Sequence, residues 1–373
     1  MMKSQPPVVY IEDPSILNEI DRVPKVKGRA SMVSSLIDSY GLKKHLNVRS
    51  SREATHEKLK SFHSQDYLDK LNSMDDPKDN PENHQEQEEV GIGYECPWIP
   101  NIMSFVRRVA GASITAAESL AQSESQISIN WFGGWHHAQR DSASGFCYVN
   151  DIVLAIHTLK KTFDKILYVD LDVHHGDGVE NAFAFTPKVY TFSMHLYEKG
   201  FFPGSGKVED VGQGNGTNFA TNVPIKRGID DEQYAYIFTN LMDEICYAFR
   251  PDAIVVQCGG DVLAGDPLGG FNVTLYGAGM CIQKIMSIKK PTLYLGGGGY
   301  NHSNTSIYWT YLTALLTGNI LPPDIPDSDP FFSSYGPSFE LQVDTSLQKN
   351  ENESQDVEDI LETLFDVLEN VSS

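Results

Sequence analysis

A short stretch of the chain, residues 166–178, combines a strand-like beginning with side chains that bind divalent metal ions. It reads Ile-Leu-Tyr-Val-Asp-Leu-Asp-Val-His-His-Gly-Asp-Gly, and its apolar, β-forming start predicts a strand over residues 166–173. Alternation along that strand would direct Asp170, Asp172 and His174 to one side. Carboxylates and an imidazole in one row repel each other unless a positive ion lies between them. The stretch therefore predicts a metal site.

Polar side chains follow four of the predicted strands, at the point where each strand ends. The strands over residues 127–131, 166–169, 253–257 and 292–295 are followed by His136 and His137, by Asp172 and His174, by Asp261, and by Tyr300. In open α/β sheets, ligands bind beyond the carboxyl ends of the strands. Glycines precede the polar side chain in three of the four segments, as expected where the backbone turns beside a pocket. We therefore expect these side chains to meet in one site.

The most specific set among them is Asp172, His174 and Asp261. Two carboxylates and one imidazole leave positions open for water and substrate, which is typical of a catalytic rather than a structural zinc site. Both Zn²⁺ and Fe²⁺ suit these ligands. The alternative is a hydrogen-bonded surface pair of Asp172 and His174, and the matching position of Asp261 argues against it.

Acid–base and oxyanion-binding groups are predicted beside the metal. His136 and His137 are candidates for general acid and base, although paired histidines also occur in solvated loops. Asp170 and Asp177 are available to orient the two rings through their other nitrogens. Tyr300 follows Gly296–Gly299, and its hydroxyl is suited to bind an oxyanion rather than only to pack.

Strands and helices alternate along the chain and must position these residues. The pattern predicts a parallel sheet with helices on both faces. Helices are predicted over residues 29–40, 53–62, 67–74, 100–121, 152–162, 179–185, 231–249, 276–288 and 308–317, and further strands over residues 8–11 and 189–194. A length of 373 residues allows one large domain or two smaller ones.

Two stretches of the sequence stand apart from this alternation of strands and helices. Residues 75–90 are acidic and interrupted by proline, which predicts a flexible loop. Residues 357–371 carry apolar side chains at helical spacing, typical of a docked amphipathic helix or of a partner-binding tail.

The composition limits the classes of binding partner and the cellular environment that we expect for this protein. The formal net charge of −21 argues against direct binding to nucleic acid phosphates and favours a basic, lysine-rich partner. The five cysteines are scattered without a CxxC pair, which indicates a reduced compartment. No apolar run approaches the length of a bilayer span, so no membrane association is expected.

Several motifs together resemble those of the class I histone deacetylases, over roughly residues 8–340. They are Trp135–Ala138, Ser144–Tyr148, Tyr168–Gly178, Gly200–Gly204 and Gly296–Tyr300. The resemblance implies one arginase-like α/β domain over residues 1–373 and zinc-dependent hydrolysis of Nε-acetyl-lysine in histones and other proteins. It also implies a role in chromatin and transcription regulation, in the nucleus and the cytoplasm, with corepressor complexes as further partners.

The resemblance also implies roles for individual residues. Zinc would be held by Asp172, His174 and Asp261, with His137 as general base beside Asp177 and His136 as its partner beside Asp170. Substrate binding is implied for Glu95, Gly145, Phe146, Phe202 and Leu268, and an internal channel for Arg29. Two potassium sites are implied, one at Asp170, Asp172, His174, Ser193 and Met194, the other at Phe183, Thr186, Val189 and Phe219. Glu95 departs from the aspartate of the family, and it is either a rim residue or a solvated loop glutamate.

Two other functions fit parts of the sequence. A ureohydrolase of the same fold would need a second metal, and Val173, Val262 and Leu263 leave the second site poorly supplied with ligands. A catalytically idle scaffold that binds acetylated tails would not need the full set of ligands, histidines and Tyr300.

Overall fold

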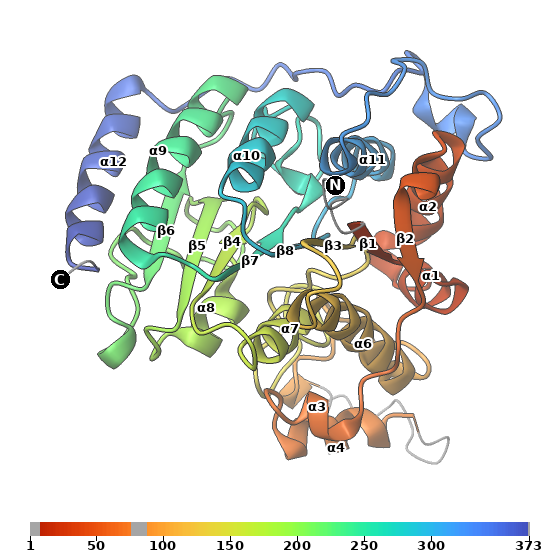
Figure 1. The fold of residues 1–373 in the computed structure, drawn as a ribbon, viewed down its shortest axis with the longest axis horizontal. Coiled ribbons are helices and arrows are strands. Elements are labelled where there is room, and N and C mark those ends of the chain that lie inside the picture. The colour runs from red at the N-terminus through yellow and green to blue at the C-terminus, as the bar shows by residue number, and fades with distance from the viewer. Residues whose placement is uncertain (1–7, 76–87, 372–373) are drawn as a thin grey trace, which may run out of the picture.

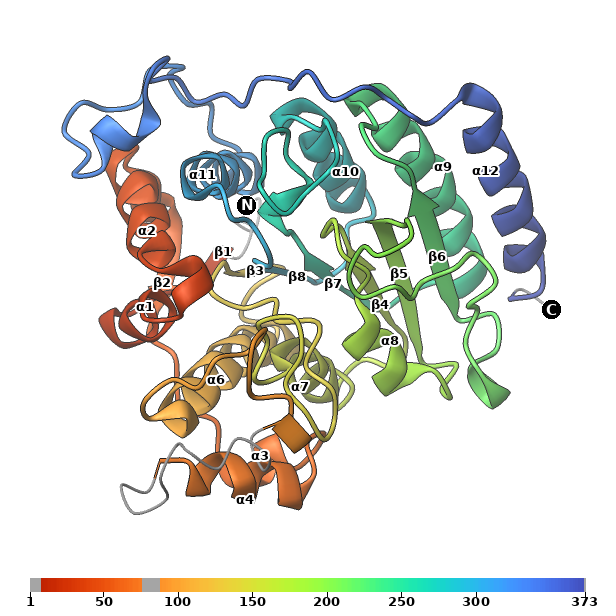
Figure 2. The same ribbon diagram turned by 180° about the vertical axis from the view of Figure 1, so that it is seen from behind.

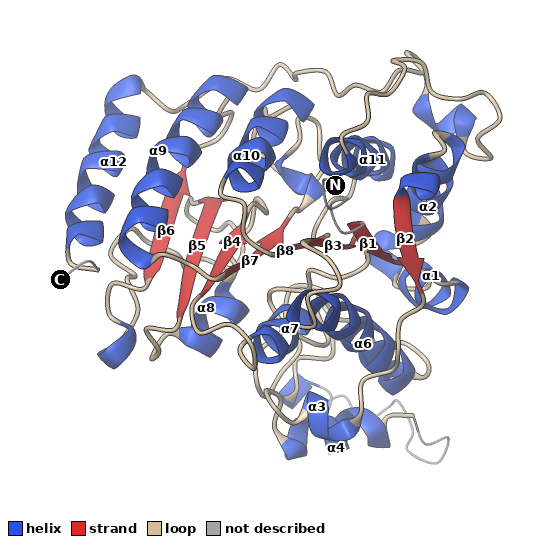
Figure 3. Ribbon diagram, viewed as in Figure 1, coloured by secondary structure: helices blue, strands red, loops and turns tan. Residues whose placement is uncertain are grey.

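The computed structural model describes residues 8–75 and 88–371, and its central feature is a parallel sheet that runs across the molecule (Figure 1 and Figure 3). The strand order is β2-β1-β3-β8-β7-β4-β5-β6, and all neighbouring strands pair in parallel. The strands are β1 (Val8–Ile11), β2 (Leu46–Arg49), β3 (Ile127–Asn130), β4 (Ile166–Asp170), β5 (Val189–Leu196), β6 (Ala220–Ile225), β7 (Ala253–Gln257) and β8 (Thr292–Leu295).

Helices cover both faces of the sheet. One layer contains α2, α9, α10 and α11, with α12 outside α9, and the other contains α6, α7 and α8 (Figure 1 and Figure 2). The helices are α1 (Pro14–Asp21), α2 (Arg29–Ser39), α3 (His56–Leu59), α4 (Gln65–Ser73), α6 (Ile102–Ala121), α7 (Asp151–Leu159), α8 (Asp177–Phe183), α9 (Asp231–Phe249), α10 (Leu275–Ser287), α11 (His302–Thr317) and α12 (Ser354–Glu369). The predicted fold class, an α/β arrangement of the arginase-like type, is confirmed.

The central strands are apolar because they are buried between these layers. Every residue of β4, β5 and β7 is buried, as expected for a parallel sheet covered on both faces. The side chains of such strands fill the core. Polar residues that bind ligands can therefore lie only beyond the carboxyl ends of the strands. Among the described residues, no helix combines the length and the apolar character needed to cross a membrane.

The strand predicted over residues 166–173 ends earlier, at Asp170. The Asp170 carboxylate accepts a hydrogen bond from the backbone N–H of Asp172 at 3.1 Å, which turns the chain out of the strand. The predicted helix over residues 53–62 is reduced to α3, because the backbone N–H of Ala54 pairs with the carbonyl of Arg107 instead of continuing a helix.

Among the α-helices and strands of the described residues, α1, β2 and β6 were not predicted. The two strands are the edges of the sheet. β2 is only partly buried, which weakens the apolar signal in its sequence. β6 is mostly buried, but its sequence includes the polar residues Thr221 and Asn222. β6 also contains Pro224, which is compatible with an edge strand but reads as a strand breaker.

The structure describes only part of the first of the two stretches set apart in the sequence, residues 75–90, and all of the second, residues 357–371. Of the predicted flexible loop at residues 75–90, residues 76–87 lie outside the described residues, whereas Val90 is buried and its carbonyl accepts a hydrogen bond from the N–H of Ala143 at 2.8 Å. The C-terminal stretch forms α12, which packs on α9 through buried apolar side chains. These are Val357, Leu361, Leu364 and Leu368.

Candidate active site

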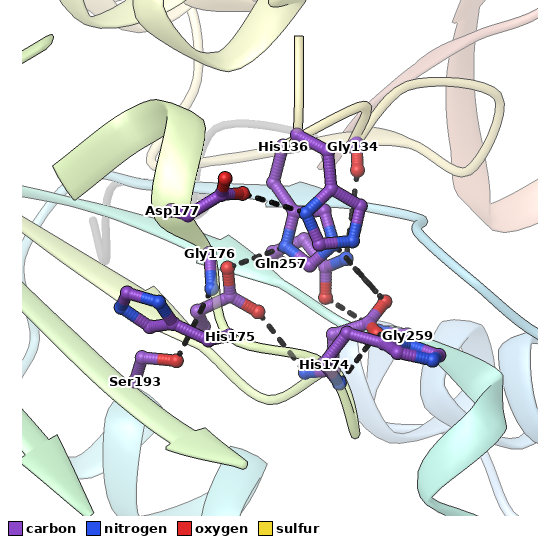
Figure 4. Close-up of polar contacts among 12 residues, drawn as sticks. Gly134, His136, His174, His175, Gly176, Asp177, Ser193, Gln257 and Gly259 are labelled. Carbon is purple, nitrogen blue, oxygen red and sulfur yellow. Dashed lines mark hydrogen bonds and ion pairs between the residues drawn. The ribbon is translucent and has the colours of Figure 1, made fainter. Parts of the chain in front are cut away.

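The four segments singled out in the sequence follow four consecutive strands of the sheet. β3, β8, β7 and β4 are neighbours in that order, so their carboxyl ends form one continuous edge. At this edge Asp172 and His174 follow β4, and Asp261 lies in the short 3-10 helix Gly260–Val262 after β7. Figure 4 shows His174, Gln257 and Gly259 in this cluster, with His136 and Asp177 next to it.

Asp172, His174 and Asp261 form the one group in the described part of the chain whose ligand atoms suit a metal ion. One ligand atom from each residue lies within 4.8 Å of the others, and all three side chains are buried. His174 Nδ1 is 3.0 Å from Asp172 Oδ1 and 3.1 Å from Asp261 Oδ2. This spacing leaves room for one cation between the three donors, because metal–ligand distances of about 2.0 to 2.2 Å separate ligand atoms by roughly this much.

The electrostatics of the group favour a positive charge at its centre. Burial and the neighbouring Asp172 carboxylate raise the pKa of Asp261 to about 7. Burial acts against protonation of His174, but its hydrogen bonds to Asp172 and Asp261 outweigh this and raise its pKa to about 10. Two buried carboxylates therefore need a compensating cation, and a divalent metal ion fits that need.

One side-chain amide and one backbone N–H hold the Asp172 carboxylate in place. Gln257, the last residue of β7, donates from Nε2 to Asp172 Oδ2 at 2.7 Å, and its Oε1 accepts from the N–H of Gly259 at 2.8 Å. The N–H of Gly298 also donates to Asp172 Oδ2, at 2.9 Å. A side chain at position 298 would collide with the Asp261 carboxylate, so this close approach requires glycine.

Asp170 does not share a row with Asp172 and His174, which corrects the prediction from strand alternation. Its Oδ2 accepts hydrogen bonds from His136 Nδ1 at 2.7 Å and from the Tyr168 hydroxyl at 2.5 Å. Asp170 is the last residue of β4, so strand alternation does not continue to Asp172 and His174. Asp170 therefore faces the tandem histidines and does not belong to the three-ligand group.

The tandem histidines lie beside the metal group and differ in charge. Asp177 Oδ1 accepts a hydrogen bond from His137 Nδ1 at 2.8 Å, which leaves Nε2 of that ring free. Burial, and then the neighbouring His136, lower the pKa of His137 to about 4. Burial also opposes charge on His136, but the Asp170 and Asp172 carboxylates outweigh it and raise its pKa to about 9. At neutral pH, His137 is therefore a neutral base and His136 a cation.

The loop that carries both histidines is fixed by α7. Asn150 caps this helix by accepting from the N–H of Val153, and Asp151 at its first turn accepts from the backbone N–H groups of Gly134 and Trp135. These bonds fix the backbone directly before His136.

A pocket of about 260 Å³ leads from the surface to this group, and we call it the outer pocket. Phe146 and Phe202 line it, and the Phe202 ring lies 4.8 Å from the His137 ring. Glu95 and Leu268 line it as well, so the structure brings these sequence-predicted residues to the same opening. Gly145 has φ +51°, and a side chain there would collide with the His137 ring.

Tyr300 and Arg29 extend the site inward. Tyr300 lines both the outer pocket and a narrow inner cavity, where Arg29 also lies. The Tyr300 backbone N–H donates to Asp266 Oδ2 at 2.7 Å, which fixes the loop after β8. Arg29 is 3% exposed, and its guanidinium donates to the carbonyls of Gly299 and Gly297 at 2.8 and 3.0 Å.

The residues of the implied potassium sites lie in or next to β4 and β5 and in the segments that flank β5 and β6. Ser193 is paired with Asp170 in the register of β5 against β4, and Met194 follows it. In the second set, the carbonyl of Phe183 accepts from the N–H of Thr186, and the carbonyl of Phe219 accepts from the N–H of Thr191 just beyond Val189.

Sequence reasoning missed four residues that the structure brings into the site: Lys25, Phe201, Gln257 and Asp266. The Lys25 ammonium lies 5.0 Å from the Phe146 ring centroid at the opening, and Phe201 is stacked on His174. The sequence could have predicted a site role for Gln257, since it is the polar last residue of an otherwise apolar strand. Phe201 lies within the Gly200–Gly204 motif but was given no role, because its contact with His174 depends on the conformation of the loop. Lys25 had no signal in the sequence.

The fold and the site together define an α/β protein with a buried three-residue group that suits a metal ion, two neighbouring histidines and an aromatic-lined entrance, an arrangement typical of a metal-dependent hydrolase. A protein-family model described as "Histone deacetylase domain" matches residues 23–316 of this chain.

Curated relatives extend this match over nearly the whole chain. Histone deacetylase 8 of Danio rerio is 45% identical over 98% of this chain and 96% of its own length, and histone deacetylase 8 of Xenopus tropicalis is 46% identical over 95% and 96%. Histone deacetylase 1 of Homo sapiens is 40% identical over 92% of this chain and 71% of its own length. The chain belongs to the histone deacetylase family.

Proposed function

We propose that this protein hydrolyses the acetyl amide of Nε-acetyl-lysine in proteins, releasing lysine and acetate. The observation that carries the proposal is the outer pocket, whose aromatic walls lead directly to the three-ligand group and to the neutral His137. A lysine side chain has four methylene groups and is neutral when acetylated, so it suits a narrow apolar passage with polar groups only at its end. Membership of the histone deacetylase family supports the same reaction.

Asp172, His174 and Asp261 would hold the metal ion, which we propose to be zinc. A bound zinc ion would act as a Lewis acid on the substrate carbonyl and on the attacking water. The donor set also suits Fe²⁺. The residues fit such an ion because their donor atoms converge and two of them are buried carboxylates, whose charge a metal ion would offset.

His137 is the proposed general base. Its Nδ1 donates to Asp177, so Nε2 carries a lone pair that can take a proton from water as the water oxygen attacks the acetyl carbon. Asp177 is itself fixed by Gln139, whose Nε2 donates to Asp177 Oδ2 at 2.9 Å. The cationic His136, held by Asp170, stabilises the negative charge that develops on the carbonyl oxygen. When the C–N bond breaks, the amine takes up the proton that His137 removed from the water, and lysine and acetate leave.

Tyr300 is the proposed hydroxyl donor to the same oxygen. Burial and then the Asp261 and Asp172 carboxylates raise the pKa of its hydroxyl well above the ordinary value, so the group stays protonated. A neutral hydroxyl that points into the pocket donates a hydrogen bond that strengthens as charge develops. Arg29 lines the inner cavity, which offers the acetate product a cationic surface.

We assign recognition of the substrate backbone to residues at the opening of the outer pocket, which we call the rim. Glu95 is exposed at the opening, where its carboxylate can accept hydrogen bonds from substrate backbone N–H groups. Acetylated histone tails are the proposed partners, since the net charge of −21 favours basic chains. We further propose action in the nucleus and the cytoplasm, potassium binding at the two sites named above, and one catalytic domain over residues 1–373.

A direct test uses an acetyl-lysine peptide and quantifies free acetate, with and without a chelator. The proposal predicts hydrolysis that the chelator abolishes and that added Zn²⁺ or Fe²⁺ restores, which also ranks the two metals. A purified protein that binds the acetylated peptide but releases no acetate with either metal would identify it as a binding scaffold. Release of urea from arginine would identify a ureohydrolase.

A further inference from the structure

The loop after β5, residues 197–204, forms one wall of the outer pocket through Phe201 and Phe202. The Phe201 ring is stacked on the His174 ring, with centroids 5.1 Å apart and an interplanar angle of 4°. His174 is one of the three metal-ligand candidates and lines the outer pocket with Phe201, so Phe201 borders the end of the passage that is next to the metal group. A movement of this loop would therefore change the width of the passage next to the acyl group.

Arg227, in the loop after β6, holds this wall from outside. Its Nε donates to both carboxylate oxygens of Glu198 at 3.0 Å, and its Nη2 donates to Oε1 at 2.6 Å. The guanidinium carbon also lies 5.8 Å from the centroid of Phe201, within the range of a cation–π contact. One side chain thus holds the wall loop at two points, Glu198 and Phe201.

The backbone of Arg227 is held in turn by the segment that precedes α12. Asn352 Nδ2 donates to the carbonyls of Lys226 and Arg227 at 3.0 and 3.2 Å, and Asn352 Oδ1 accepts from the N–H of Lys226 at 2.9 Å. The N–H of Glu351 donates to the Arg227 carbonyl at 3.0 Å. The docked C-terminal segment therefore supports the loop from which Arg227 reaches the pocket wall.

The ion pair itself contributes little to global stability. The side chains of Arg227 and Glu198 are 32% and 37% exposed, and exposed ion pairs contribute at most about 1 kcal/mol. Its bidentate geometry instead fixes orientation, because both partners are held in one plane. The consequence of losing it is expected at the pocket wall and not in the core.

We propose that Arg227 is a positioning residue that sets the acyl-chain selectivity of the pocket. It keeps Phe201 against His174, so that the passage fits an acetyl group and disfavours longer acyl groups on lysine. The proposal rests on the deacylase function proposed above. Without Arg227, the wall loop moves outward, acetyl-lysine loses its close fit, and a longer acyl chain gains room.

The test compares one peptide sequence carrying either acetyl-lysine or butyryl-lysine. Arg227→Ala should lower kcat/KM for the acetyl peptide by about 5- to 10-fold and affect the butyryl peptide less, so that the acetyl-to-butyryl ratio falls. Arg227→Lys should recover part of the ratio, because Lys keeps the charge but not the planar fork. Asn352→Ala should shift the ratio in the same direction by a smaller factor.

The matched control is Arg108→Ala, which removes a comparable surface ion pair, Arg108 with Glu53 at 2.7 Å, away from the pocket. The ratio should stay at the wild-type value in this variant. Equal losses on both peptides, or an unchanged ratio, in Arg227→Ala and in the milder Glu198→Gln would overturn the proposal. A wild-type protein that hydrolyses neither peptide would instead refute the deacylase function on which it rests.

Discussion

Replacing Tyr300 with Phe removes one hydroxyl from the site and leaves the rest of the side chain. The ring should keep its place, because the backbone N–H of Tyr300 is held by Asp266 and the ring packs edge-on against Phe146 with centroids 5.8 Å apart. The substitution therefore isolates the contribution of one hydrogen-bond donor to the developing oxyanion.

The expected loss is in kcat. Removing one donor from an oxyanion site lowers kcat by about 10²- to 10³-fold, or ~2.7 to 4 kcal/mol of transition-state stabilisation. KM should change little, because Phe146 and Phe202 still line the pocket proposed to hold the methylene groups of the substrate. Steady-state acetate release from an acetyl-lysine peptide gives both constants, and the metal content of the variant shows that the site is intact.

Tyr308→Phe is the matched control. It removes a buried hydroxyl that makes no hydrogen bond and that does not line either cavity, so kcat should stay at the wild-type value. An unchanged kcat with a raised KM in Tyr300→Phe would refute the reasoning and leave Tyr300 as a packing or binding residue.

Three further predictions concern the rim, the base and pH. Glu95→Ala should lower kcat/KM for acetylated peptides by about 1 to 3 kcal/mol and affect a minimal acetyl-lysine mimic without flanking amides much less; equal losses on both would point to a general change of the rim. Asp177→Asn should lower kcat by about 10- to 100-fold, since His137 loses the partner that orients its ring, whereas Asp164→Asn on the surface should be neutral. Because the pKa of His137 is lowered to about 4, the base stays neutral above that pH, so the acid limb of a kcat profile should lie well below pH 6.5; a limb at 6.5 would contradict this assignment.

The sequence was sufficient for the parts of the site that follow buried strands. Apolar runs such as Ile166–Val169 and Ala253–Gln257 are strongly patterned, and the polar residues after them converge because parallel strands end at one edge. The prediction that Asp172, His174 and Asp261 meet depends only on that rule. It required no knowledge of loop conformation.

The parts that could not be predicted depend on contacts between distant segments. The strand alternation over residues 166–174 misplaced Asp170, because its carboxylate bonds the backbone of Asp172 and ends the strand. Phe201 reaches His174 only through the conformation of the wall loop. The edge strand β2 was missed because it is only partly buried and its apolar signal is weak, and β6 was missed because Thr221, Asn222 and Pro224 interrupt its apolar pattern.

The central claim is that Asp172, His174 and Asp261 hold one catalytic metal ion, and metal content measured together with acetate release tests it most directly. Wild-type protein and a His56→Ala control should contain about one metal ion per chain and be active. His174→Ala and Asp261→Asn should lose both the metal and the activity, because a three-ligand site has no spare ligand. Wild-type metal content and rate in either variant, or two tightly bound metal ions per wild-type chain, would contradict the claim.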